Sequence, residues 1–218
     1  MTSDIDFNAN GHPPRGRPKL RSDEGNSDAI LHAAALLFTQ RGYAGTTMSD
    51  VAATARMSLQ TVYRLYAGKI DLFAAVVALH RRSMIALPGN FDDLPVEEAL
   101  ARIFLIDIDA DAERERQALM EIFVSEMRQF PELRPIFMRE GAERANDLLT
   151  QWLESQDQRG LLNVPDAPTT AKLLLDVVFG AASMKMSTAP EWPGGADRPL
   201  YLRRCFKLLA DGLRPRQG

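Results

Sequence analysis

The sequence has very little cysteine and no long apolar run. Its single cysteine, Cys205, excludes an intrachain disulfide and a cysteine-rich zinc module. The richest apolar stretch, residues 173–182, is about half the roughly 20 residues that cross a bilayer, and residues 1–26 contain no apolar segment typical of a secretory signal. We therefore expect a cytoplasmic protein with no membrane partner.

The sequence also lacks the motifs of common enzymes. It contains no nucleophile elbow, Walker loop or glycine-rich dinucleotide motif, and none of its three histidines has a second ligand three or four residues after it. Asp107, Asp109 and Asp111 have the spacing of a calcium loop, but Ala112 and Ala118 replace the glycine and the closing glutamate. We expect no catalytic residue, metal or cofactor.

The net charge is small, but the charged residues are unevenly distributed along the chain. The net charge is −3, which is not that of a general electrostatic nucleic-acid binder. Residues 12–69, however, carry eight basic residues against four acidic ones. This asymmetry indicates that the N-terminal part of the chain faces nucleic acid.

Apolar residues recur at helical spacing throughout, and no segment alternates with period two. A first helix is expected after Asn26 or Ser27, ending before Gly42. A capping box of Thr47 and Asp50 opens a second, Ser58 caps a third, and a fourth runs from Lys69 toward Pro88. Longer helices are expected over 95–109, 113–129, 132–158, 168–187 and 198–213.

The pattern predicts an all-α protein in three parts. Residues 1–26 are too poor in apolar groups to fold alone and form a flexible basic arm. Residues 27–70 form a three-helix DNA-binding unit, with a helix-turn-helix from Thr47 to Tyr66 in which Ala52 is small at the helix crossing and Val62 fills the core. Residues 71–218 form a larger helical bundle.

The segment FTQRGYAGTTMSDVAATARMSLQTVYRLYAGKIDLF resembles the N-terminal domain of the TetR family of transcriptional repressors. The matching positions include Phe38, the Gly42-Tyr43 pair, Lys69 and Leu72, and the resemblance is strong over about a quarter of the chain. Arg56 stands where the family often has glycine, which leaves the shape of the inter-helix turn open.

The resemblance implies a set of DNA-contacting residues: Thr47, Ser58, Leu59, Gln60, Thr61, Tyr63, Arg64 and Lys69. Gln60 can pair with adenine, Thr61 can touch a thymine methyl, and Tyr63 and Arg64 can donate to phosphates. For Leu59, packing beside Val62 and contact with a thymine methyl are both open. In the arm, the Arg15-Gly16-Arg17-Pro18 sequence predicts that Arg15 and Arg17 enter the minor groove; the alternative is a solvated basic linker.

Residues 129–162 resemble, more narrowly, the AefR-like C-terminal domain of that family. The resemblance implies a dimer and a small-molecule pocket. Apolar and small residues near the end of the chain are assigned to the dimer interface: Leu174, Val178, Ala181, Ala182, Leu202, Cys205, Phe206 and Leu209. Bulky residues are candidate pocket walls, although such stripes usually form core: Phe104, Ile108, Met120, Phe123, Met127, Phe137, Trp152 and Phe179.

Together these features predict a homodimeric, DNA-binding transcriptional regulator. We expect a repressor that leaves a palindromic operator when a small apolar or aromatic molecule binds. The alternative is a helical small-molecule-binding or protein-interaction module that does not bind DNA specifically. Arg56, Leu59 and the net negative charge motivate that alternative.

Overall fold

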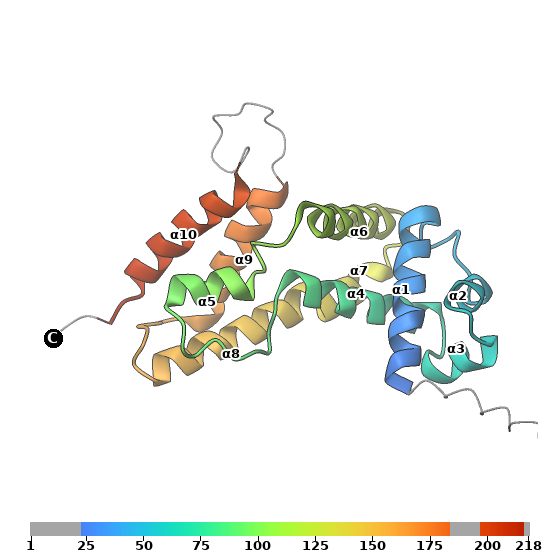
Figure 1. The fold of residues 1–218 in the computed structure, drawn as a ribbon, viewed down its shortest axis with the longest axis horizontal. Coiled ribbons are helices and arrows are strands. Elements are labelled where there is room, and N and C mark those ends of the chain that lie inside the picture. The colour runs from blue at the N-terminus through green and yellow to red at the C-terminus, as the bar shows by residue number, and fades with distance from the viewer. Residues whose placement is uncertain (1–22, 184–196, 216–218) are drawn as a thin grey trace, which may run out of the picture.

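The computed structural model describes residues 23–180, the backbone of 181–183, and residues 197–215, and every regular element in these ranges is helical (Figure 1). The expected all-α fold is confirmed. Residues 1–22 of the predicted arm, which include Arg15 and Arg17, and the side chains of Ala181 and Ala182 lie outside the described residues. The elements are α1 (Asp23–Arg41), α2 (Met48–Ala55), α3 (Leu59–Leu65), α4 (Lys69–Met84), α5 (Val96–Ile103), α6 (Ala110–Gln129), α7 (Leu133–Phe137), the π-helical turn η1 (Met138–Glu143), α8 (Arg144–Gln158), α9 (Ala167–Ser183) and α10 (Arg198–Gly212).

Helix α1 begins earlier than the sequence pattern predicted. It starts at Asp23, so Asn26 and Ser27 lie inside the helix and are not its caps, and residues 23–26 do not belong to a flexible arm. Asp23 and Glu24 occupy the first turn. Carboxylates there interact favourably with the positive end of the helix dipole. The sequence pattern did not predict this first turn, because its residues are polar and show no apolar periodicity.

One core joins the first three helices to α4. It contains aromatic rings that follow one another through the unit: Phe38 and Tyr43 with centroids 5.9 Å apart, Tyr43 and Phe73 at 5.5 Å, and Phe73 and Phe123 at 5.4 Å. Phe123 belongs to α6 and is completely buried. The N-terminal helices are therefore packed directly against α6 of the C-terminal part.

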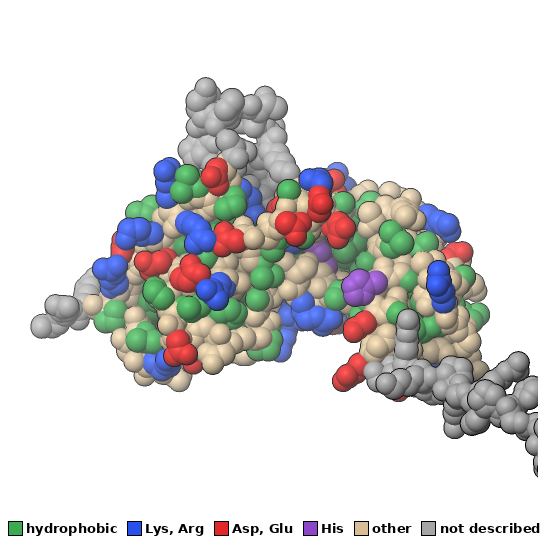
Figure 2. All heavy atoms as spheres, in the orientation of Figure 1, with side chains coloured by type: hydrophobic (Ala, Val, Ile, Leu, Met, Phe, Trp, Pro, Cys, Tyr) green, Lys and Arg blue, Asp and Glu red, His purple; other side chains and the backbone are tan. Residues whose placement is uncertain are grey.

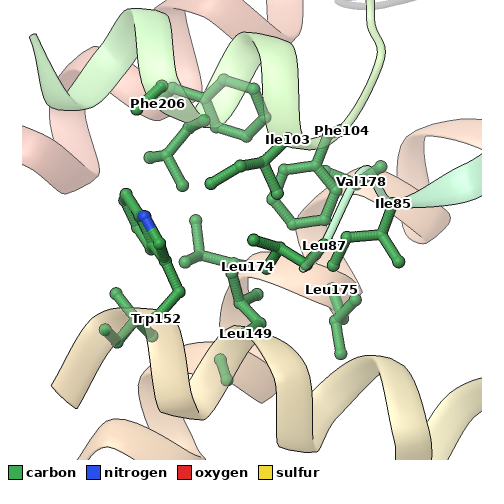
Figure 3. Packing of buried hydrophobic residues seen from close by; sticks show 14 of the residues in the cluster. Ile85, Leu87, Ile103, Phe104, Leu149, Trp152, Leu174, Leu175, Val178 and Phe206 are labelled. Atoms are coloured by element: carbon green, nitrogen blue, oxygen red, sulfur yellow. The ribbon is translucent and has the colours of Figure 1, made fainter. Parts of the chain in front are cut away.

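A second core lies at the other end of the molecule, between α5, α8, α9 and α10 (Figures 1 and 3). Figure 3 shows Trp152 and Leu149 of α8 facing Leu174 of α9 and Phe206 of α10. Phe206 stacks on Phe104, with ring centroids 5.6 Å apart and planes at 23°. This core holds the C-terminal helices together within one chain.

Charges of both signs are interspersed over the visible face of the C-terminal helices (Figure 2). Arg203 of α10 contacts both Glu98 of α5 and Asp107, for example. Each of the three spaced aspartates has a structural contact: Asp107 pairs with Arg203, Asp109 caps α6, and Asp111 pairs with Arg114. No helix within the described ranges combines the length and apolarity that a membrane span requires.

His80 of α4 is buried between α4 and α6, with its ring 5.4 Å from that of Phe123. Burial, and secondarily the nearby Arg116 guanidinium, lower the pKa of His80 to about 4. The adjoining surface also carries His32, Arg82 and Glu115. His80 is therefore neutral at physiological pH in the folded protein.

This burial predicts a loss of stability in mild acid. The unfolded chain binds a proton at His80 below about pH 6.5, whereas the folded chain binds it only near pH 4. Above about pH 6.5, His80 therefore does not change the free energy of unfolding. As the pH falls from 6.5 toward 4, it lowers the free energy of unfolding by about 3 kcal/mol in total. Urea unfolding measured from pH 7 to 4 should show a shallower decline for His80→Gln than for the unmodified chain. The exposed His32→Gln variant should retain the full decline, and an equal decline in all three proteins would contradict the assignment.

Candidate nucleic-acid interface and adjoining cavity

The second helix begins with the predicted capping box. Thr47 Oγ1 accepts a hydrogen bond from the backbone N–H of Asp50 at 3.1 Å, and the Asp50 carboxylate accepts one from the N–H of Thr47 at 3.0 Å. Hydrogen bonds from the Thr47 side chain and backbone hold the pKa of Asp50 below its usual value. The start of α2 is thus fixed by two reciprocal bonds, with Thr47 exposed beside it.

The turn between α2 and α3 keeps the shape that glycine would adopt. Arg56 has φ 55° and ψ 47°, in the left-handed region. Its N–H donates to the Ala53 carbonyl, and the N–H of Met57 donates to the Ala52 carbonyl at 2.9 Å. This Schellman arrangement closes α2. The left-handed conformation of a non-glycine residue costs about 1 kcal/mol, so the helix-turn-helix geometry is retained at that cost.

Helix α3 presents a polar outer face. Ser58 caps it, accepting from the N–H of Thr61 at 3.0 Å. Gln60, Thr61, Tyr63 and Arg64 lie along one surface hollow, and Tyr63 is half exposed. Val62 is completely buried beneath them, as predicted, whereas Leu59 is 38% exposed and therefore lies on the surface rather than in the core.

Arg64 already has a partner within the chain. Its guanidinium donates to both carboxylate oxygens of Asp23 at 2.7 and 3.0 Å, which ties α3 to the start of α1. The hydrogen bonds from Arg64 lower the pKa of Asp23, and both side chains remain exposed. A phosphate that approached Arg64 would have to compete with this carboxylate.

Lys69 is directed inward, contrary to its expected phosphate contact. Its ammonium donates to the carbonyls of Tyr43 and Thr46 at 2.8 and 3.0 Å and lies 4.3 Å from the centre of the Tyr43 ring. These contacts occupy the ammonium in this conformation. Lys69 instead holds the turn before α2, and so positions Thr47.

A cavity of about 360 Å³ lies beside α6; we call it the α6 cavity. Of the predicted wall residues, only Met120 and Phe179 line it. The sequence interpretation missed the residues that give it its other walls: Met84, Glu113, Arg116, Val124 and Arg198. Their signal was the spacing of Glu113, Arg116, Met120 and Val124 along one side of α6.

The remaining predicted wall residues occupy other places. Phe104 and Trp152 belong to the C-terminal core, and Phe123 to the N-terminal one. Met127 and Phe137 pack against the N-terminal core, and Ile108 is half-buried away from the cavity. These six residues therefore do not line the α6 cavity, because each packs in a core or lies elsewhere.

The charged end of the α6 cavity is tightly arranged. Glu113 pairs with Arg116, and Arg198 Nη1 lies 3.4 Å from a Glu113 oxygen. Burial lowers the pKa of Arg198. The Glu113 carboxylate raises this pKa, and the Arg116 guanidinium lowers it further. Two guanidiniums therefore share one carboxylate at this end.

The predicted dimer residues also need correction. Leu174, Val178, Leu202 and Phe206 are at most 2% exposed and face the chain's own core, as Figure 3 shows for three of them, so they have no surface left for a partner. Leu209 packs against the same core, and Cys205 is half-buried. The exposed apolar groups on these helices are Leu173, Leu200 and Leu208.

Two family models match the chain. Residues 30–76 match the model of the bacterial regulatory proteins of the TetR family, and residues 98–202 match that of the AefR-like transcriptional repressor C-terminal domain. The first match covers most of α1, α2, α3 and the first half of α4, and the second runs from within α5 to within α10. Together they span well over half of the chain.

Individual relatives agree with these matches. An uncharacterized HTH-type transcriptional regulator, YezE, from Bacillus subtilis (strain 168) is 29% identical over 156 residues, which cover 69% of this chain and 80% of that protein. A TetR-family regulator structure from Rhodococcus sp. superposes with a TM-score of 0.66 at 20% identity, covering 85% of this chain and 98% of that one. The flavonoid-responsive regulator FrrA superposes with a TM-score of 0.56 at 25% identity, covering 88% and 98%. The chain belongs to the TetR family and is a DNA-binding transcriptional regulator.

Proposed function

We propose that the protein is a homodimeric repressor that binds a roughly palindromic operator and leaves it when a small molecule binds. The observation that carries the DNA-binding part is the exposed face of α3, where Gln60, Tyr63 and Arg64 surround one hollow above a buried Val62. A helix of this kind enters a major groove, and two of them related by a two-fold axis meet half-sites roughly 35 Å apart.

The small-molecule part rests on the α6 cavity and on the path from it to the DNA-binding unit. Helix α6 carries Arg116 at the cavity and Glu126 nearly three turns later. Glu126 is buried against Gly42 after α1: a Cβ placed on Gly42 would lie 2.4 Å from its Oε1. A shift of α6 on ligand binding would therefore displace the end of α1. The relative FrrA is described as flavonoid-responsive, which agrees with a ligand-controlled regulator.

The dimer part rests on the exposed apolar surface of α9 and α10, at the end of the molecule opposite α2 and α3 (Figure 1). Leu208 is 74% exposed and Leu173 48%. A Cβ added to Gly180 would meet no described atom within 4 Å, so a partner helix can approach closely there. These groups replace the buried residues of the sequence-based interface.

The operator proposal predicts a base-specific role for Gln60. Selection from a random duplex library at physiological salt should yield an inverted repeat. Gln60→Ala should weaken binding by about 1–3 kcal/mol and relax preference at one adenine in each half-site, because the amide can bind adenine N6 and N7. Gln151→Ala, exposed on α8, should change nothing. Retention without sequence preference, lost with modest salt, would instead favour the non-specific helical module.

The pairing of Arg64 with Asp23 predicts a tighter-binding variant. Asp23→Asn should free the guanidinium for a phosphate and raise operator affinity a few-fold. Glu24→Gln removes the same charge one residue away and serves as the control for long-range electrostatics. Electrophoretic or fluorescence titration of both variants at one salt concentration measures the difference. An equal rise in operator affinity in both variants would show that freeing Arg64 from Asp23 does not add a phosphate contact.

The dimer proposal predicts that Leu208→Lys produces monomers. A lysine at this 74% exposed position would place a charge in the interface while leaving the chain's own core untouched. Sedimentation velocity should give a dimer for the unmodified chain and a monomer for the variant, with weaker operator binding. Leu161→Lys, at a 45% exposed leucine after α8, should remain dimeric. A dimeric Leu208→Lys protein would place the interface elsewhere.

A further inference from the structure

The α6 cavity has two chemically different ends. One is apolar, with walls from Met84 of α4, Met120 and Val124 of α6, and Phe179 of α9. The other is charged, with Glu113, Arg116 and Arg198. A ligand that fills both ends needs an apolar body and a charged or strongly polar head.

The charged end carries an excess of positive charge away from water. The Arg116 side chain is 4% exposed and that of Arg198 15%, and both share the one carboxylate of Glu113. At the rim, the exposed Glu121 and Arg128 oppose each other in sign. One buried positive charge therefore has no full counter-charge among the cavity residues. Such a charge is costly unless it is paired.

Arg198 also has hydrogen-bonding capacity to spare. Its contacts with Glu113 and with the Val178 carbonyl are both long, at 3.4 Å. Its Nε is buried, and no group in the described chain accepts a hydrogen bond from it. A guanidinium whose Nε has no acceptor and whose Nη groups make only long contacts can donate to the two oxygens of a carboxylate.

We propose that the α6 cavity binds an organic monocarboxylate, with the carboxylate on Arg198 and Arg116 and an aromatic or aliphatic body against Met84, Met120 and Phe179. This inference rests on the proposed ligand response and specifies its chemistry. One surplus positive charge matches a singly charged carboxylate better than a phosphate monoester, which carries nearly two charges. At about 30 Å³ per small group, the volume accommodates roughly a dozen non-hydrogen atoms.

The test is direct binding to the full chain without DNA. Benzoate, 3-phenylpropanoate, 2-naphthoate and octanoate are titrated by calorimetry, each beside its uncharged primary amide. At least one acid should bind at millimolar concentration or below and should bind roughly tenfold or more tightly than its amide. Failure of all four acids, or equal affinity of acid and amide, would overturn the proposal.

Variants locate the carboxylate. Arg198→Gln should weaken binding of the acid roughly tenfold or more while leaving that of the amide unchanged. Arg204→Gln, an exposed arginine on the same helix, should bind both like the unmodified chain. Arg198 is preferable to Arg116, because the Arg116 side chain is more deeply buried, at 4% against 15% exposed, and its bond to the Ser83 carbonyl is shorter than the contacts of Arg198. Unchanged acid affinity in Arg198→Gln would show that Arg198 does not bind the carboxylate and would overturn the proposal.

The outcome is separable from the proposed function. An acid that binds through Arg198 but leaves operator affinity unchanged would support the carboxylate site and contradict ligand-controlled release. Release of the operator by an uncharged molecule, with no acid bound, would support release and overturn the carboxylate site.

Discussion

The contact on which the architecture depends is the packing of Phe123 into the core of the DNA-binding unit. Its ring lies edge-on to Phe73 of α4 at 5.4 Å and close to Phe137 at 5.6 Å, with no exposure. Without it, α1 to α4 would have to cover their core some other way. Because Phe123 comes from α6, the helix-turn-helix cannot complete its core without a helix of the C-terminal part.

This shared core constrains how a signal could travel. Helix α4 runs from Lys69, which holds the turn before α2, to Met84 at the α6 cavity. Helix α6 runs from Arg116 at the cavity to Glu126 at Gly42. Close-packed helices transmit displacement rather than absorb it. A ligand changes operator affinity only if it binds one arrangement of these helices better than another. Helices α4 and α6 can carry such a change, because each extends from the α6 cavity to the DNA-binding unit.

The sequence predicted best what is decided locally. The capping box at Thr47, the cap at Ser58 and the buried Val62 follow from spacing alone, because their partners lie within one or two turns. The spacing of apolar residues identifies the apolar face of a helix, but it does not identify the residues that cover this face. Leu174, Leu202 and Phe206 therefore looked like a dimer face, although their partners are Trp152, Phe104 and other residues of the same chain. Leu208, outside the apolar stripe, is the most exposed leucine of the described part of these helices, at 74%.

The cavity was missed for a related reason. Arginine is rarely buried, so Arg116 in a charged stretch of α6 suggests a solvated face. Its burial follows from Glu113 on the same helix and the Ser83 carbonyl on α4, a long-range arrangement that periodicity does not encode. Lys69 likewise resembled a phosphate contact until the carbonyls of Tyr43 and Thr46 accounted for its ammonium.

Two features that oppose stability lie in the regions assigned to binding. Arg56 adopts a left-handed conformation at the helix-turn-helix, and Arg116 and Arg198 share one carboxylate at the cavity. Neither arrangement improves the packing of the free chain, and local rules are usually broken where function requires it. The second has a specific consequence. An anion that supplied the missing charge would stabilise whichever arrangement of α4, α6 and α10 brings both arginines to it, and mass action would then favour that arrangement over the one that fits DNA.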